Sequence, residues 1–261
     1  MEGDFKINFT HIRHGSHIIE FKGKKFLVDP VFADVGTMSS MPKARTKAKN
    51  PLIPMPFGFD FVNTLDAVLL THTHFDHFDD KAIEILPKSL PIICRSHDVK
   101  KVNKSGFTNI ITIDDADVIF NDIHVKTVGG RHGVGLAGML MGKTTGFILS
   151  DASGEASEPK TYIIGDSIWC DEVETTLKKE QPDVIIAFAG AAVLPFGKNI
   201  TMATGDIHEL AKASKNAKLI AIHMDTWSHC FLTKDVLKDF IKDKTYKHRI
   251  MIPNEGDHLS F

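Results

Sequence analysis

The chain has 261 residues and is 43% hydrophobic, which is enough for one large core or two closely packed halves. A net charge of −2 and a pI near 6.7 give no electrostatic basis for binding nucleic acid or an anionic membrane. The three cysteines are widely spaced and odd in number, which argues against a disulfide framework. Because the first residues also lack the pattern of a secretory signal, we expect a cytoplasmic protein.

Short runs rich in β-branched and aromatic residues predict strands at residues 5–11, 17–21 and 25–29. A long irregular segment then runs from residue 33 to about residue 63 and contains four prolines and four basic residues. Such a segment is either a solvated surface loop or a lid whose positive charge attracts a phosphate or carboxylate of the substrate. The second interpretation makes Arg45 a candidate substrate-binding residue.

Strand-like and helix-like runs alternate through the rest of the chain. The apolar run at 67–71 predicts a buried strand, and Asp79 and Asp80 predict the cap of a helix that continues to Leu86. Further strands are predicted at 92–93, 110–113, 123–128, 147–149, 162–164, 184–188 and 219–222, and helices at 171–179, 207–215 and 233–243. Since no linker or repeat divides the chain, we predict one α/β (α+β) domain over residues 1–261.

Four potential metal ligands stand within six residues, directly after the apolar run at 67–71: His72, His74, Asp76 and His77. Alternate residues of an extended chain point to the same side, so His72 and His74 can converge on one ion. Asp76 and His77 lie where the chain must turn and can serve a second ion. Imidazole and carboxylate ligands suit zinc, manganese, iron or nickel more than calcium. A polar surface turn is the common alternative for a lone histidine, but not for this spacing.

This H-x-H-x-D-H run after an apolar strand resembles the signature of the metallo-β-lactamase superfamily, and the resemblance covers nearly the whole chain. It implies a four-layer αββα sandwich with the metal ions at one edge of the two sheets. The opening at residues 14–20 and 28–30 is similar to that of one branch, which contains ascorbate-6-phosphate lactonase-like proteins and relatives of N-acyl-phosphatidylethanolamine phospholipase D. His14 is the matching histidine, and it is either a substrate-binding residue or a buried structural one. Asp29 is expected to accept from a metal-bound imidazole or to stabilise a loop.

The resemblance also implies ligands at later strand ends. His132 matches the third ligand of the first ion, Asp166 the carboxylate that bridges both ions, and His223 the last histidine of the second ion. Each follows an apolar run, and strand ends can converge at one rim of a sheet. The residues themselves leave alternatives open. His132 could be a turn residue, Asp166 a helix N-cap, and Asp225 or His229 could replace His223.

The predicted cofactors are two divalent ions, zinc or manganese first, with iron or nickel as further options. Such a pair activates a bridging hydroxide for attack on a carbonyl or phosphoryl centre. Asp76 is the candidate catalytic residue, since it could orient that hydroxide or carry a proton to the leaving group. We therefore predict a dinuclear metal-dependent hydrolase that acts on a lactone or a phosphodiester, the substrate being small and anionic.

Two other classes of function are considered. An iron-bearing redox protein is disfavoured because relatives of that kind carry a flavin-binding domain, for which 261 residues leave no room. An inactive, metal-stabilised binding protein is disfavoured because the set of ligands is complete. A small-molecule substrate is the expected partner, with no nucleic acid and no membrane span, because the longest apolar run, at 184–197, is short and contains Pro195. A homo-oligomer is left open.

Overall fold

Two mixed β-sheets of seven strands each form the centre of the computed structural model, which describes residues 7–114, 116–142, 144–154, 158–195 and 197–261. The first sheet, in spatial order, consists of β14 (His258–Ser260), β1 (Asn8–Arg13), β2 (Ser16–Phe21), β3 (Lys24–Val28), β4 (Ala67–Leu69), β5 (Ile92–Cys94) and β6 (Ile110–Thr112). The second consists of β13 (Ile250–Met251), β12 (Lys218–Ile222), β11 (Val184–Phe188), β10 (Thr161–Ile163), β9 (Thr145–Asp151), β8 (Ile123–Gly129) and β7 (Val118–Phe120).

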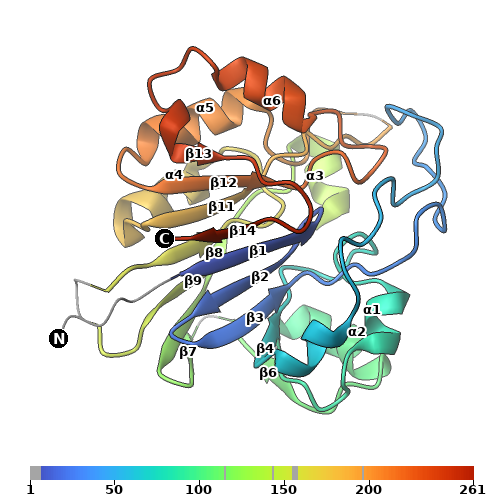
Figure 1. Ribbon diagram of the computed structural model, residues 1–261, viewed down its shortest axis with the longest axis vertical. Coiled ribbons are helices and arrows are strands. Elements are labelled where there is room, and N and C mark those ends of the chain that lie inside the picture. The colour runs from blue at the N-terminus through green and yellow to red at the C-terminus, as the bar shows by residue number, and fades with distance from the viewer. Residues whose placement is uncertain (1–6, 115, 143, 155–157, 196) are drawn as a thin grey trace.

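Helices cover the outer faces of both sheets (Figure 1). The first sheet is covered by α1 (Asp80–Ile85) and α2 (Ser96–Lys104), and the second by α4 (Asp171–Glu180), α5 (Thr204–Ala213) and α6 (Lys234–Ile241). A further helix, α3 (Gly135–Met141), lies beyond the end of β8, and η1 (Asp60–Thr64) and η2 (Lys247–Arg249) are short 3-10 turns. This arrangement is the predicted four-layer αββα sandwich, so the predicted fold class is confirmed.

Successive side chains of each strand point to opposite faces of its sheet, so the apolar side chains form three layers of core: one between the sheets and one under the helices on each outer face. In β11, Ile186 and Phe188 point between the two sheets, whereas Ile185 packs under the helices of the second sheet. In β3, Phe26 points between the sheets and Leu27 packs under α1 and α2. Because successive side chains of a strand point to opposite faces, strands that are apolar throughout are buried on both sides, as a four-layer fold requires.

The sequence located most elements within a few residues. Asp79 is the N-cap of α1, as predicted, and its carboxylate accepts from the backbone N–H of Ala82 at 2.7 Å. The strand predicted at residues 5–11 is β1, displaced to Asn8–Arg13, and residues 5 and 6 lie outside the described residues. Helices α2 and α3 and strands β7, β13 and β14 were not predicted.

The segment at 33–63 is not the wholly irregular loop that the sequence predicted. It contains a β-bridge between Met38 and Asn50, and η1 begins near its end. Asn50 is buried and its side-chain oxygen accepts from the backbone N–H of Ser228 at 2.8 Å. The backbone N–H of Leu52 donates to the Thr226 carbonyl at 2.7 Å. The segment is therefore tied to the loop that follows β12.

The ends of several strands meet at one rim of the sandwich. In the first sheet β4 is parallel to β3, and in the second β10, β11 and β12 are parallel to one another, so within each sheet these carboxyl ends lie at the same edge. The contacts between His77, which follows β4, and both Asp166 and His223 show that the two edges meet. Strand β8 is antiparallel to β9, which is antiparallel to β10, so β8 also ends at this rim. Among the described residues, no helix is long and apolar enough to cross a membrane.

Candidate metal centre

Three histidines from two strand ends form the first group of donors at this rim. His72 and His74 follow β4, and His132 follows β8. One ring nitrogen from each lies within 4.8 Å of the others. Two of these histidines make a polar contact through Nδ1. Nδ1 of His72 lies 2.9 Å from Oγ1 of Thr71, and Nδ1 of His132 lies 2.8 Å from the Ile200 carbonyl oxygen. These contacts direct the Nε2 atoms toward the centre of the group.

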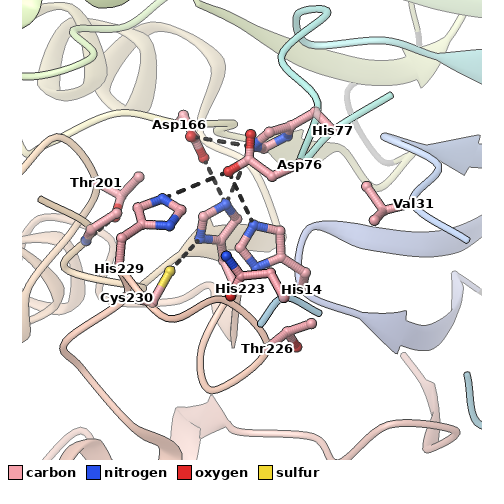
Figure 2. A network of polar contacts seen from close by, with 12 residues as sticks. His14, Val31, Asp76, His77, Asp166, Thr201, His223, Thr226, His229 and Cys230 are labelled. Atoms are coloured by element: carbon pink, nitrogen blue, oxygen red, sulfur yellow. Dashed lines mark hydrogen bonds and ion pairs between the residues drawn. The ribbon is translucent and has the colours of Figure 1, made fainter. Parts of the chain in front are cut away.

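A second group combines Asp76 with histidines from three parts of the chain. Asp76 and His77 come from the same turn as the first group, His223 follows β12, and His14 lies between β1 and β2. A donor atom from each lies within 4.8 Å of the others. The Nε2 atoms of His77 and His223 are 3.3 Å apart, and Figure 2 shows the rings of His14 and His223 beside the Asp76 carboxylate.

Asp166 lies between the two groups, in the turn that follows β10. Its Oδ2 atom is 3.4 Å from Nε2 of His132 and 3.2 Å from Nε2 of His77, and its Oδ1 atom is 3.1 Å from Nε2 of His223. One carboxylate therefore faces nitrogens of both groups. The alternative role as a helix N-cap does not occur, because α4 begins five residues later with Cys170 as its N-cap.

Asp29 supports the centre from outside, as the sequence predicted. Its Oδ2 atom accepts from Nδ1 of His77 at 2.8 Å and from the Thr71 hydroxyl at 2.6 Å, and its Oδ1 atom accepts from the Thr71 backbone N–H at 2.8 Å. The carboxylate is fully buried. It therefore orients the ring of His77 and fixes the backbone where β4 leads into the histidine run.

The electrostatics of the cluster keep its carboxylates charged. Burial opposes the ionisation of Asp166, but His223 and then His77 outweigh it and hold the pKa of this carboxyl well below its usual value. Asp76 behaves alike: burial opposes its charge, while His77 and His14 hold its pKa well below the usual value. Burial lowers the pKa of His223 to about 4. His77 differs: burial lowers its pKa, but Asp166, Asp29 and Asp76 together raise it well above the usual value, so a metal ion would have to displace its proton. Carboxylates with imidazoles that have lost their protons are the donor set that binds a transition metal.

Unpartnered polar atoms test whether a metal fits here. Among the described residues, Nε2 of His72, Nε2 of His132 and Oδ1 of Asp166 are buried without a hydrogen-bond partner. Leaving such atoms unsatisfied costs about 1–3 kcal/mol each. All of them face the centre between the two groups, so divalent ions would satisfy them. The residues present therefore fit a metal centre.

The structure brings together all the residues that the sequence predicted as ligands: His72, His74, Asp76, His77, His132, Asp166 and His223. His14, predicted as a substrate-binding candidate, lies among them. The rival Asp225 points elsewhere, since its Oδ2 atom accepts from the backbone N–H of Lys234. His229, considered only as a distant rival, is a neighbour that sequence reasoning undervalued: its Nε2 atom is 3.7 Å from Asp76.

Arg45 lies apart from this cluster. Its Nε atom donates to the Cys230 carbonyl at 3.2 Å, its backbone N–H donates to the Ser228 carbonyl at 2.8 Å, and its guanidinium lies 4.0 Å from Asp225. Arg45 thus connects the segment at 33–63 to the loop after β12. Part of its donor capacity is used in this connection, and its side chain remains about one-third exposed.

Comparison with known proteins agrees with this geometry. The model of the beta-lactamase superfamily domain matches residues 24–224, and the chain belongs to that superfamily. More narrowly, it is 34% identical to the UPF0173 protein YddR of Bacillus subtilis over 98% of this chain and 100% of that one. It is 28% identical to a UPF0173 metal-dependent hydrolase of Thermoplasma acidophilum, over 84% and 85% of the two chains.

Two solved structures resemble the whole chain. A protein of Veillonella parvula described as a possible metal-dependent hydrolase has a TM-score of 0.90 and 32% identity, over 97% of this chain and 98% of the other. An isothiocyanate hydrolase from Delia radicum gut bacteria also has a TM-score of 0.90, with 28% identity over 97% and 99%. The fold, the donor cluster and these relatives together place the chain among the metal-dependent hydrolases of the metallo-β-lactamase fold.

Proposed function

We propose that the protein is a hydrolase with two metal ions, one held by His72, His74 and His132 and the other by Asp76, His77 and His223, with Asp166 bridging them. The observation that carries this proposal is the position of Asp166, whose two oxygens lie 3.1–3.4 Å from histidines of both groups. Zinc or manganese suits this donor set best, and iron or nickel remains compatible with it.

Divalent ions at such a site activate water near neutral pH and stabilise negative charge that develops on the substrate. The protein's own residues then orient the reaction. Asp76 is charged and lies within 3.7 Å of both His14 and His229, so it is the carboxylate best placed to orient the attacking water or to pass its proton to the leaving group. Asp29 fixes His77 and thereby the position of the cluster.

The substrate classes suggested by the sequence are a lactone and a phosphodiester, and a third class is favoured by the surroundings of the site. Phe75 is exposed directly beside Asp76, and Phe231 is exposed directly after Cys230. The exposed side chains of α3 that follow His132 are also apolar: Leu136, Met139 and Leu140. An apolar rim suits a small electrophile with an apolar substituent.

An isothiocyanate is such an electrophile, and the solved structure of an isothiocyanate hydrolase is 28% identical over nearly the whole chain. Water adds across its C=N bond: a C–O bond forms, the C=N double bond becomes single, and the nitrogen takes up the proton that the water loses, which gives a thiocarbamic acid. We therefore propose isothiocyanates as the first substrates to test, ahead of lactones and phosphodiesters.

The test compares wild-type protein, purified without a histidine tag, with the double variant His72→Ala, Asp166→Ala. Elemental analysis should find close to two ions per wild-type chain. The double variant should lose the bound metal and hydrolysis of all three substrate classes, while its circular dichroism spectrum stays close to that of the wild type. Full metal content in the double variant would show that the site is wrongly assigned. Bound iron with no hydrolysis would favour the redox alternative.

A further inference from the structure

His14 lies in the turn between β1 and β2, in a conformation that is unusual for a histidine. Its φ angle is 54°, in the left-handed region that costs an ordinary side chain about 1–2 kcal/mol. The backbone is held there, because the His14 carbonyl accepts from the backbone N–H of His223 at 3.0 Å. Glycine would meet the demands of this turn without strain, so the imidazole has a use beyond the turn.

The surroundings of the ring indicate what that use is. The side chain is fully buried, and neither ring nitrogen has a hydrogen-bond partner among the described residues. Nε2 lies 3.6 Å from Oδ2 of Asp76, which is too long for a hydrogen bond. The ring centroid is 3.5 Å from that of His223, and Figure 2 shows the two rings side by side, with His14 in contact with Asp76 and His223 in contact with Asp166.

A ring nitrogen of His14 lies within 4.8 Å of donor atoms of Asp76, His77 and His223. These three residues hold the second ion in the function proposed above, on which this inference rests. We propose that His14 is an additional protein ligand of the second ion. Among the described residues, the group formed by His72, His74 and His132 contains no such additional histidine. The two sites would then differ in donor number, with four protein ligands at the first (His72, His74, His132 and Asp166) and five at the second (Asp76, His77, His223, Asp166 and His14).

Two substitutions separate ligation from a role in positioning Asp76. His14→Gly and His14→Asn both tolerate a positive φ angle, so neither strains the turn. Asparagine retains a side chain that can hydrogen-bond to Asp76, but it lacks the imidazole nitrogen. The matched control is His17→Asn, since His17 is buried in β2 of the same hairpin and its Nδ1 atom contacts the Gly15 carbonyl rather than the cluster.

Metal-free protein is titrated with Zn²⁺ in competition with a chromophoric chelator, which gives both dissociation constants. Wild type and His17→Asn should bind two ions. Both His14 variants should keep the first site and lose about 100-fold or more in affinity at the second, beyond the 10–100-fold loss that follows removal of an outer hydrogen-bond partner. Added imidazole should restore the second ion in His14→Gly, because it can occupy the space left by the ring.

Two ions bound with unchanged affinity in both variants would overturn the role of His14 and leave the two-ion function intact. Loss in His14→Gly but not in His14→Asn would show a positioning role and would also overturn ligation. A single ion in the wild-type protein would overturn the two-ion function itself, and the ligand role of His14 with it.

Discussion

At the scale of single residues, Asp29 orients the donor cluster although it is not one of the proposed ligands. It accepts three hydrogen bonds, from the backbone and hydroxyl of Thr71 and from His77, and has a φ angle of 45°. Asp29→Asn preserves the shape and tolerates that angle, but it sets an amide N–H against the ring N–H of His77. We expect metal affinity to fall about 10–100-fold and the free energy of unfolding by about 1–3 kcal/mol.

Chelator competition and urea unfolding measure these two effects. Asp66→Asn is the control, because Asp66 also accepts a backbone N–H, from Lys25, but next to the opposite end of β3. This variant should lose stability without losing metal affinity. If Asp29→Asn binds metal as tightly as the wild type, the orienting role of the carboxylate is refuted.

The burial of His17 leads us to expect that the metal-free protein loses stability as the pH falls. Burial lowers the pKa of His17 to about 3, whereas an exposed histidine titrates near 6.5. Between these values the unfolded chain binds the additional proton, so stability contributed by the neutral ring is lost as the pH falls below 6.5. The loss amounts to about 1.4 kcal/mol per pH unit.

His17→Asn removes this titration while keeping a donor for the Gly15 carbonyl. Urea unfolding between pH 7.5 and pH 5, with chelator present, should therefore give a smaller slope of unfolding free energy against pH than in the wild type. Identical slopes would show that His17 is already protonated, or is reached by water, in the folded protein.

At the scale of elements, the turn after β10 determines where Asp166 lies. Gly165 has a φ angle of +73°, and a Cβ atom there would lie 2.8 Å from the Thr145 carbonyl oxygen of the neighbouring strand. Gly165→Ala therefore combines the cost of a left-handed alanine, about 1–2 kcal/mol, with a clash against backbone that displaces the turn. We expect a loss of more than 2 kcal/mol in stability and weaker binding of both ions.

Gly154→Ala is the matched control for this substitution. Gly154 has nearly the same φ angle, +75°, but nothing lies within 4 Å of the added Cβ atom. Thermal unfolding should show only the conformational cost, and metal content by elemental analysis should remain that of the wild type. Equal losses in the two variants would mean that the close approach to β9 is unimportant.

At the scale of the whole molecule, the proposed ligands come from both sheets, so bound metal connects the two halves of the sandwich. Ligands that bind only the folded state stabilise it by about 2.7 kcal/mol at 100 times their dissociation constant. For a chain of this length, 1 kcal/mol corresponds to about 2–4 °C. Two such sites contribute about 5 kcal/mol, so removing both ions should lower the melting temperature by roughly 10–20 °C.

Because the sheets share one core, we propose that the chain is a single domain and unfolds in one step. Trp169 packs against the core of the second sheet and Trp227 is buried beside His14, so their fluorescence reports on separate regions. Fluorescence and circular dichroism should give coincident transitions, with and without metal. Two separated transitions would contradict the single domain, and an unchanged melting temperature without metal would contradict the connection.

Local sequence alone determined much of the site. The run from His72 to His77 is a set of donors spaced for one strand end. The resemblance to the metallo-β-lactamase superfamily implied His132, Asp166 and His223, and the apolar run before each of them agreed with a position at a further strand end. Side-chain periodicity and chain direction act over a few residues, which is why such predictions succeed. Helix α2 was not predicted because it is mostly polar. Strands β13 and β14 were not predicted because they span only two and three residues.

Only the tertiary structure decided which distant residues meet. His14 precedes His223 by about 200 positions, yet their rings are 3.5 Å apart, because the turn between β1 and β2 reaches the rim where β12 ends. His229 and Arg45 likewise owe their places to loops packed on one another. These loops pack on one another only after the two sheets have packed around their shared core. Hydrophobic periodicity reports local secondary structure, so it carries no information about such long-range contacts.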